Sequence, residues 1–133
     1  MRHGVDIHRA LQFLDLDMDG CDDGNVCAAK SPLATKIKQN PEILKFWGAG
    51  ARTEVPIAGL TDGKFQSLRI DRMIVQGDEV LFLDYKTDQT RERRDEYIKK
   101  LSQYSALLAR VYHGKKIRAH ILWLHDWELE EVG

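Results

Sequence analysis

The stretch "RIDRMIVQGDEVLFLDYKT" (69–87) carries charged residues inside two otherwise apolar runs. Both runs are rich in β-branched or large apolar residues, as strands are, and Gly77-Asp78 between them favours a tight turn. The stretch therefore predicts an antiparallel hairpin with strands over 67–76 and 79–87.

Three charged residues of this hairpin are predicted to lie together. Side chains alternate across a strand, so Asp84 and Lys86 project from one face, and pairing across the turn brings Asp71 close to Asp84. Two close carboxylates repel unless a cation neutralises them. Mg²⁺ suits such a pair, because it binds a few carboxylate oxygens, keeps several waters and is completed by substrate phosphates. The alternative is a structural cluster in which Lys86 and Arg72 neutralise both aspartates.

Hydrophobic periodicity predicts the elements that surround the hairpin. The segment 53–60 reads as a strand that completes a three-strand meander, and 116–124 reads as a further strand. Between them, apolar residues at three- and four-residue steps predict one long helix with its apolar face on the sheet. These residues are Tyr97, Leu101, Tyr104, Leu108 and Val111. The expected fold class is α/β, with a mixed sheet of the meander plus one strand that follows a crossover helix.

The N-terminal third is predicted to contain two helices and an acidic loop. Apolar spacing favours a helix near 5–15, and Asn40 followed by Pro41 favours the start of a short helix within 40–48. Between these helices, "DLDMDG" (15–20) is similar to the opening of a calcium-binding loop. Val26 stands where that loop needs a bidentate Glu, so we favour a solvated acidic loop over a calcium site.

Composition limits the class of protein. A chain of 133 residues with 43% hydrophobic residues fits one globular domain, so we expect a single domain over 1–133. No apolar run is long enough to span a membrane, and the first residues lack the apolar centre of a signal peptide. Cys21 and Cys27 are too few for a disulfide scaffold. We therefore expect a soluble, cytoplasmic protein with free thiols and without a membrane partner.

The segment "LRIDRMIVQGDEVLFLDYKT" (68–87) resembles the active-site hairpin of the PD-(D/E)XK nucleases, in the form found at the C-terminus of RecB and AddA helicase-nucleases. Four further segments are similar to that family in the same order. They are "GVDIHRAL" (4–11), "NPEILKFWGAGARTEVPIAG" (40–59), "YIKKLSQY" (97–104) and "ILWLHDWELEEV" (121–132). The resemblance covers nearly the whole chain, and "EVPIAG" (54–59) is closer to AddA than to RecB. It implies a restriction-endonuclease-like core.

The resemblance implies a set of site residues. His8, Asp71 and Asp84 match the family's metal ligands, and Lys86 matches its catalytic lysine, so Asp71, Asp84 and Lys86 are the expected catalytic residues. The expected cofactor is Mg²⁺, for which Mn²⁺ substitutes. Glu54 matches an acidic position of the family and is expected either behind the metal ligands or beside an arginine.

The helix after the hairpin departs from the family pattern. Lys100 stands where the family usually has Gln, four residues before the tyrosine matched by Tyr104, and Gln103 is displaced by nearly a full turn. We expect Lys100 and Tyr104 near the site, together with Glu54. A lysine at this position is expected to alter either activity or the positioning of DNA.

Basic residues after the hairpin are a local source of DNA contact, because the net charge of −1 provides no general attraction. The candidate DNA-binding residues are Arg72, Arg91, Arg94 and Lys99. The alternative is a solvated helix start, since Asp88, Glu92, Asp95 and Glu96 are interleaved with them. Both interpretations remain open.

The predicted function is metal-dependent exonuclease cleavage of DNA, as single strands or ends. The resemblance also implies double-strand break repair with an AddB-like partner subunit and an upstream helicase domain, since the chain has no phosphate-binding loop of its own. The chain is therefore expected to be a fragment of a longer helicase-nuclease or a stand-alone remnant. The alternative is a nuclease-fold module that binds DNA or a partner with little cleavage, and a calcium-binding domain is the third hypothesis.

Overall fold

The structure is a computed structural model, and it describes Leu11 and residues 32–132. The chain divides into two compact units, Met1–Ala49 and Gly50–Gly133. Of the helix predicted near 5–15, only Leu11 lies within the described residues, where it is helical and buried. His8, the acidic loop and both cysteines lie outside them.

The described part of the first unit consists of short helices. They are α2 (Pro32–Lys38), α3 (Pro41–Leu44) and the 3₁₀-helix η2 (Lys45–Trp47). The Asn40 side chain accepts a hydrogen bond of 2.9 Å from the backbone N–H of Glu42, which caps α3, and Pro41 occupies its first turn. The predicted short helix is therefore confirmed, whereas α2 was not predicted.

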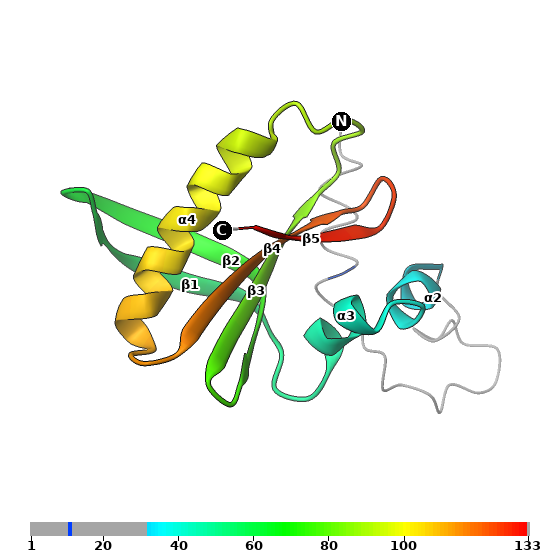
Figure 1. Cartoon of the computed structure of the whole chain (residues 1–133), viewed down its shortest axis with the longest axis horizontal. Coiled ribbons are helices and arrows are strands. Elements are labelled where there is room, and N and C mark those ends of the chain that lie inside the picture. Colours follow the sequence, from blue (N-terminus) through cyan, green and yellow to red (C-terminus); the bar gives the residue numbers. More distant parts are fainter. Residues whose placement is uncertain (1–10, 12–31, 133) are drawn as a thin grey trace. The chain divides into compact units, whose positions relative to one another are not determined.

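The second unit is built on a five-stranded mixed sheet (Figure 1). Its strands are β1 (Arg52–Thr61), β2 (Lys64–Gln76), β3 (Glu79–Lys86), β4 (Lys116–Trp123) and β5 (Glu128–Val132). They lie side by side in chain order, and every neighbouring pair is antiparallel except β3 and β4, which are parallel. The predicted α/β class, the meander and the strand after a crossover helix are confirmed. The structure adds β5, which pairs with β4.

Two tight turns set the register of the meander. Asp62 and Gly63 join β1 to β2 with φ angles of 52° and 77°, and this pair of positive φ values is the reason that Asp-Gly is favoured in two-residue hairpin loops. Gly77, with φ of 55°, begins the predicted turn between β2 and β3. Both turns therefore depend on local sequence.

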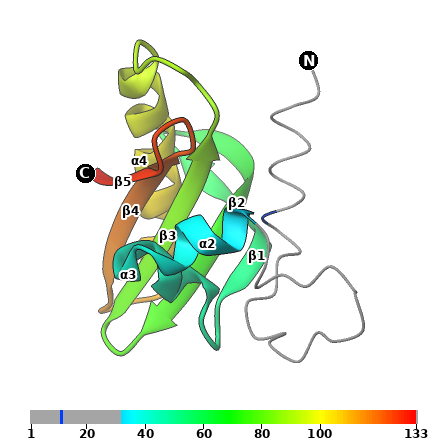
Figure 2. The ribbon, with the colours of Figure 1, turned by 90° about the vertical axis from the view of Figure 1, so that its right-hand side faces the viewer.

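Helix α4 (Arg94–Val111) makes the crossover between the parallel strands and runs along one face of the sheet (Figures 1 and 2). Of its predicted apolar residues, Tyr97, Leu101, Tyr104 and Leu108 are buried. Val111 is 62% exposed, so its predicted place in the core is wrong, and Leu107 is buried instead. Among the described residues, no helix has both the length and the apolar character needed to cross a membrane.

Candidate active site

The hairpin brings two aspartates together. Asp71 lies on β2 and Asp84 on β3, and the register that pairs Arg72 with Leu83 places the two aspartates opposite each other at the next step. Their carboxyl groups share a hydrogen bond. The predicted proximity of Asp71 and Asp84 is therefore confirmed.

Asp71 is the more strongly perturbed of the two groups. Burial raises its pKa most, the hydrogen bond with Asp84 and the charge of Asp84 raise it further, and the resulting pKa is about 8. The backbone N–H of Tyr85 donates to Asp71 Oδ2 at 2.9 Å and lowers the pKa in part. At neutral pH the raised pKa therefore favours the protonated form of Asp71.

Lys86 completes the cluster. Its Nζ lies 2.8 Å from Asp84 Oδ2 and 4.2 Å from the ring centroid of Tyr97 on α4. The ammonium therefore sits between a carboxylate and an aromatic face, and both attract a cation. Tyr97 is itself fixed by a hydrogen bond of 2.8 Å from its hydroxyl to Asp88 Oδ2. The spacing of apolar residues predicts only a core position for Tyr97, because nothing local shows that its ring lies beside Lys86.

Glu54 and Tyr104 lie near the aspartates, as predicted. Glu54, with a positive φ of 51°, interrupts the pairing of β1 with β2 opposite Asp71, and its charge contributes to the raised pKa of Asp71. Tyr104 is 4% exposed, and burial together with the charges of Asp84 and Asp71 raises its pKa to about 12. Its hydroxyl is therefore neutral. Lys100, one turn earlier on α4, is exposed.

The cluster has the donor set for a cation that needs few protein ligands. Within residues 32–132 no group of three or more His, Cys, Asp or Glu side chains has the arrangement of a metal site. Asp71 and Asp84 nevertheless present two adjoining carboxyl groups, and Mg²⁺ takes one or two carboxylates with waters and substrate oxygens. The predicted third ligand, His8, lies outside the described residues.

The predicted basic residues are not arranged as one DNA-binding surface. Arg72 is 4% exposed, and its Nε donates to the Tyr85 hydroxyl at 3.0 Å, so the predicted contact between Arg72 and DNA does not fit this structure. The period of two along β2 is the reason, because Arg72 projects from the side of the sheet that carries Tyr85. Lys99 is exposed on α4, as a phosphate contact requires.

Arg91 and Arg94 are engaged by carboxylates of the β4–β5 hairpin. Arg91 pairs with Asp126 at 3.0 Å and with Glu128, and its guanidinium lies 4.9 Å from the Trp123 ring centroid. Arg94 Nε donates to Glu130 at 2.7 Å. These pairs favour the alternative of internally neutralised charge. Of the acidic residues expected from the sequence, Asp95 lies 4.0 Å from Arg94, whereas the closer partners belong to the β4–β5 hairpin. Their separation of 35 to 37 positions gives no local signal.

Compared with known proteins, the chain matches no family model and none of the curated proteins. The resemblance to the PD-(D/E)XK nucleases therefore rests on the motifs quoted above. The geometry of the cluster is independent of that resemblance, because it follows from strand register and side-chain contacts alone.

Proposed function

We propose that this chain is a metal-dependent deoxyribonuclease with a PD-(D/E)XK nuclease core, acting as an exonuclease on DNA ends in the manner of the AddA nuclease domain. One observation carries the proposal. Asp71 and Asp84 lie side by side on neighbouring strands, and Lys86 forms an ion pair with Asp84. A partly buried carboxyl group with a raised pKa, such as Asp71, is costly to ionise, and such groups gather at functional sites.

Asp71 and Asp84 are the proposed ligands of Mg²⁺ or Mn²⁺, with His8 as a third ligand by family resemblance. The bound metal supplies a Lewis acid for a phosphate oxygen and an acidified water. Lys86 has a different task. Its ammonium lies beside the carboxyl pair. From this position it orients the attacking water or stabilises negative charge on the scissile phosphate. Tyr97 limits where that ammonium lies.

The proposed substrate is single-stranded DNA or a DNA end. Lys99 and Lys100 are exposed on α4, one turn or less from the tyrosines beside the cluster, and are the proposed phosphate contacts. By family resemblance, the proposal extends to an upstream helicase domain, an AddB-like partner, double-strand break repair and a cytoplasmic location.

A second candidate function is a nuclease-fold module that binds DNA or a partner and cleaves little. One observation favours it: Lys86 already neutralises Asp84 at 2.8 Å, as it does in a purely structural cluster. The two candidates differ in whether a divalent cation takes over that role. Binding of Mg²⁺ at the pair requires Asp71 to lose its proton and Asp84 to share its charge.

Degradation of end-labelled single-stranded DNA by the purified chain tests the proposal. We expect cleavage with Mg²⁺ or Mn²⁺, none with EDTA, and none with Asp84→Asn. Asp78→Asn is the matched control, since Asp78 is exposed at the opposite end of the same hairpin and undergoes the same change of charge. If the folded protein binds DNA without cleaving it in either metal, the binding module replaces the nuclease.

A further inference from the structure

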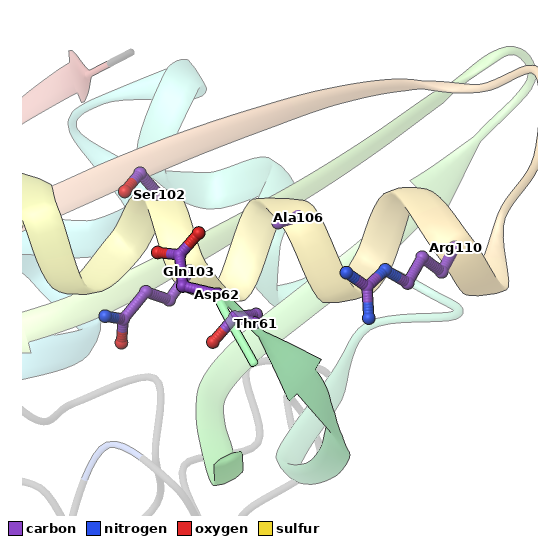
Figure 3. Close-up of a pocket in the computed structure, with 6 residues that line it drawn as sticks. All are labelled: Thr61, Asp62, Ser102, Gln103, Ala106 and Arg110. Atoms are coloured by element: carbon purple, nitrogen blue, oxygen red, sulfur yellow. The ribbon is translucent and has the colours of Figure 1, made fainter. Parts of the chain in front are cut away.

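A polar pocket lies between the end of the β1–β2 hairpin and α4 (Figure 3). Its volume is about 240 Å³, enough for a planar ring system but not for a whole nucleotide strand. Thr61 and Asp62 border it from the hairpin turn, and Ser102, Gln103, Ala106 and Arg110 border it from the helix. None of these residues belongs to the carboxylate cluster.

The walls of the pocket are held in place by the fold. Arg110 Nη1 donates to the backbone carbonyl of Leu60, which ties the end of β1 to α4. Gly59 permits this approach, because a Cβ at that position would lie 2.7 Å from Leu107 Cδ2. Asp62 is fixed by its turn, where it adopts a positive φ. The Arg110–Leu60 hydrogen bond and the close packing at Gly59 therefore hold the two walls of the pocket together.

The polar groups favour an uncharged ligand. Asp62 contributes a negative charge that repels phosphate, and the guanidinium of Arg110 opposite it leaves the pocket without net charge. Ser102 Oγ is occupied, donating to the Lys99 carbonyl at 2.6 Å. Within residues 32–132, the Asp62 carboxylate and the Gln103 amide make no hydrogen bond and present an acceptor and a donor–acceptor pair to a ligand.

Helix α4 connects this pocket to the candidate active site. Gln103 lines the pocket, and the next residue, Tyr104, lies within the electrostatic influence of Asp71 and Asp84. At about 1.5 Å per residue, Gln103 and Ala106 stand roughly 9 to 14 Å along the helix from Tyr97, which holds Lys86. That distance corresponds to about three to four nucleotides of a stacked strand.

We propose that this pocket is a subsite for one nucleobase of the DNA strand, selective for a base with an exocyclic amino group. Asp62 accepts a hydrogen bond from that amino group, and Gln103 bonds the neighbouring ring atoms. Cytosine, adenine and guanine carry such a group, and uracil and thymine do not. The inference rests on the proposed function, because it takes the DNA strand from the cluster as the ligand.

Binding of matched oligo(dC) and oligo(dU) strands tests the subsite without cleavage. Cytosine carries an amino group at position four, where uracil carries a carbonyl oxygen. Fluorescence anisotropy, measured in EDTA at mildly alkaline pH, therefore reports the effect of this one group on affinity. We expect the intact chain to bind oligo(dC) about fivefold more tightly than oligo(dU). This ratio is at the low end for a base-specific contact, because the pocket is open to solvent. Asp62→Asn removes the carboxylate and retains a residue that suits the turn, and it should abolish the difference.

Asp78→Asn is the matched control, because it neutralises the aspartate of the β2–β3 turn and should leave the preference unchanged. Equal affinities for the two strands, no binding of either strand, or a preference that survives Asp62→Asn would each overturn the subsite. The cleavage assay separates the two proposals. Cleavage without base preference would exclude only the proposed subsite. Base preference without cleavage would exclude only the proposed nuclease activity.

Discussion

Replacing Asp71 with asparagine should make the metal-free protein more stable, by an amount that grows with pH. The pKa of Asp71 is raised from its ordinary value of 3.8 to about 8. Its contribution to stability is therefore full below about pH 4, where the folded and unfolded chains are both protonated, and is lost progressively as the pH rises towards 8. Asparagine cannot ionise, so the variant avoids this loss.

The size of the effect follows from the shift. Between pH 3.8 and pH 7 the difference is 3.2 pH units, and at about 1.4 kcal/mol per unit it reaches about 4 kcal/mol as an upper limit. Asparagine retains the hydrogen bonds, because its oxygen accepts from the Tyr85 N–H and its amide donates to Asp84. Half of that upper limit, about 2 kcal/mol, would raise the melting temperature by roughly 6 °C for a chain of this size.

Thermal unfolding followed by circular dichroism in EDTA, from about pH 5 to about pH 8, measures this effect. The melting temperatures of the intact chain and Asp71→Asn should diverge as the pH rises. Asp78→Asn, which changes an exposed aspartate, should follow the intact chain. Parallel curves for the intact chain and Asp71→Asn would refute the reasoning, because they would mean that the carboxyl pair ionises without cost.

Three further predictions concern the cluster and its surroundings. Adding Mg²⁺ or Mn²⁺ should raise the melting temperature of the intact chain but not of Asp84→Asn, and an equal rise in both would place the cation elsewhere. Lys86→Ala should lower the rate of metal-dependent DNA cleavage by at least about 100-fold while DNA affinity, measured by anisotropy, changes little. Lys99→Ala should weaken DNA binding and reduce its salt dependence, whereas Arg91→Ala should leave both unchanged because Arg91 is engaged by Asp126 and Glu128.

The hairpin was predictable from sequence because its signals are local. Two apolar runs of strand length and the Gly77-Asp78 turn between them determine which residues face each other, and this register alone brings Asp71 to Asp84. The same logic predicted α4 from its spacing of apolar residues. The predicted core position of Val111 was wrong because this residue lies in the last turn of α4, where its side chain is 62% exposed.

The features that the sequence did not reveal depend on distant partners. The acidic segment "ELEEV" (128–132) resembles a tail rather than a strand, yet its carboxylates pair with Arg91, Arg94 and Arg118 from other elements. Arg72 is predicted to contact DNA because nothing in its sequence neighbourhood shows that its Nε donates to the Tyr85 hydroxyl at 3.0 Å. Periodicity identifies a buried face, but it does not identify which polar group neutralises a buried charge.

The charge balance of the cluster bears on the choice between a structural and a catalytic role. In the metal-free site Lys86 Nζ pairs with Asp84 at 2.8 Å, while burial and the charges of Asp84 and Glu54 raise the pKa of Asp71. Burial and the neighbouring carboxylate hold the pKa of Asp71 well above its ordinary range, so the fold opposes ionisation of this group. In the proposed nuclease, a divalent cation shared with Asp84 would favour the ionised form, which is why metal binding and the pH dependence of stability report on the same residue.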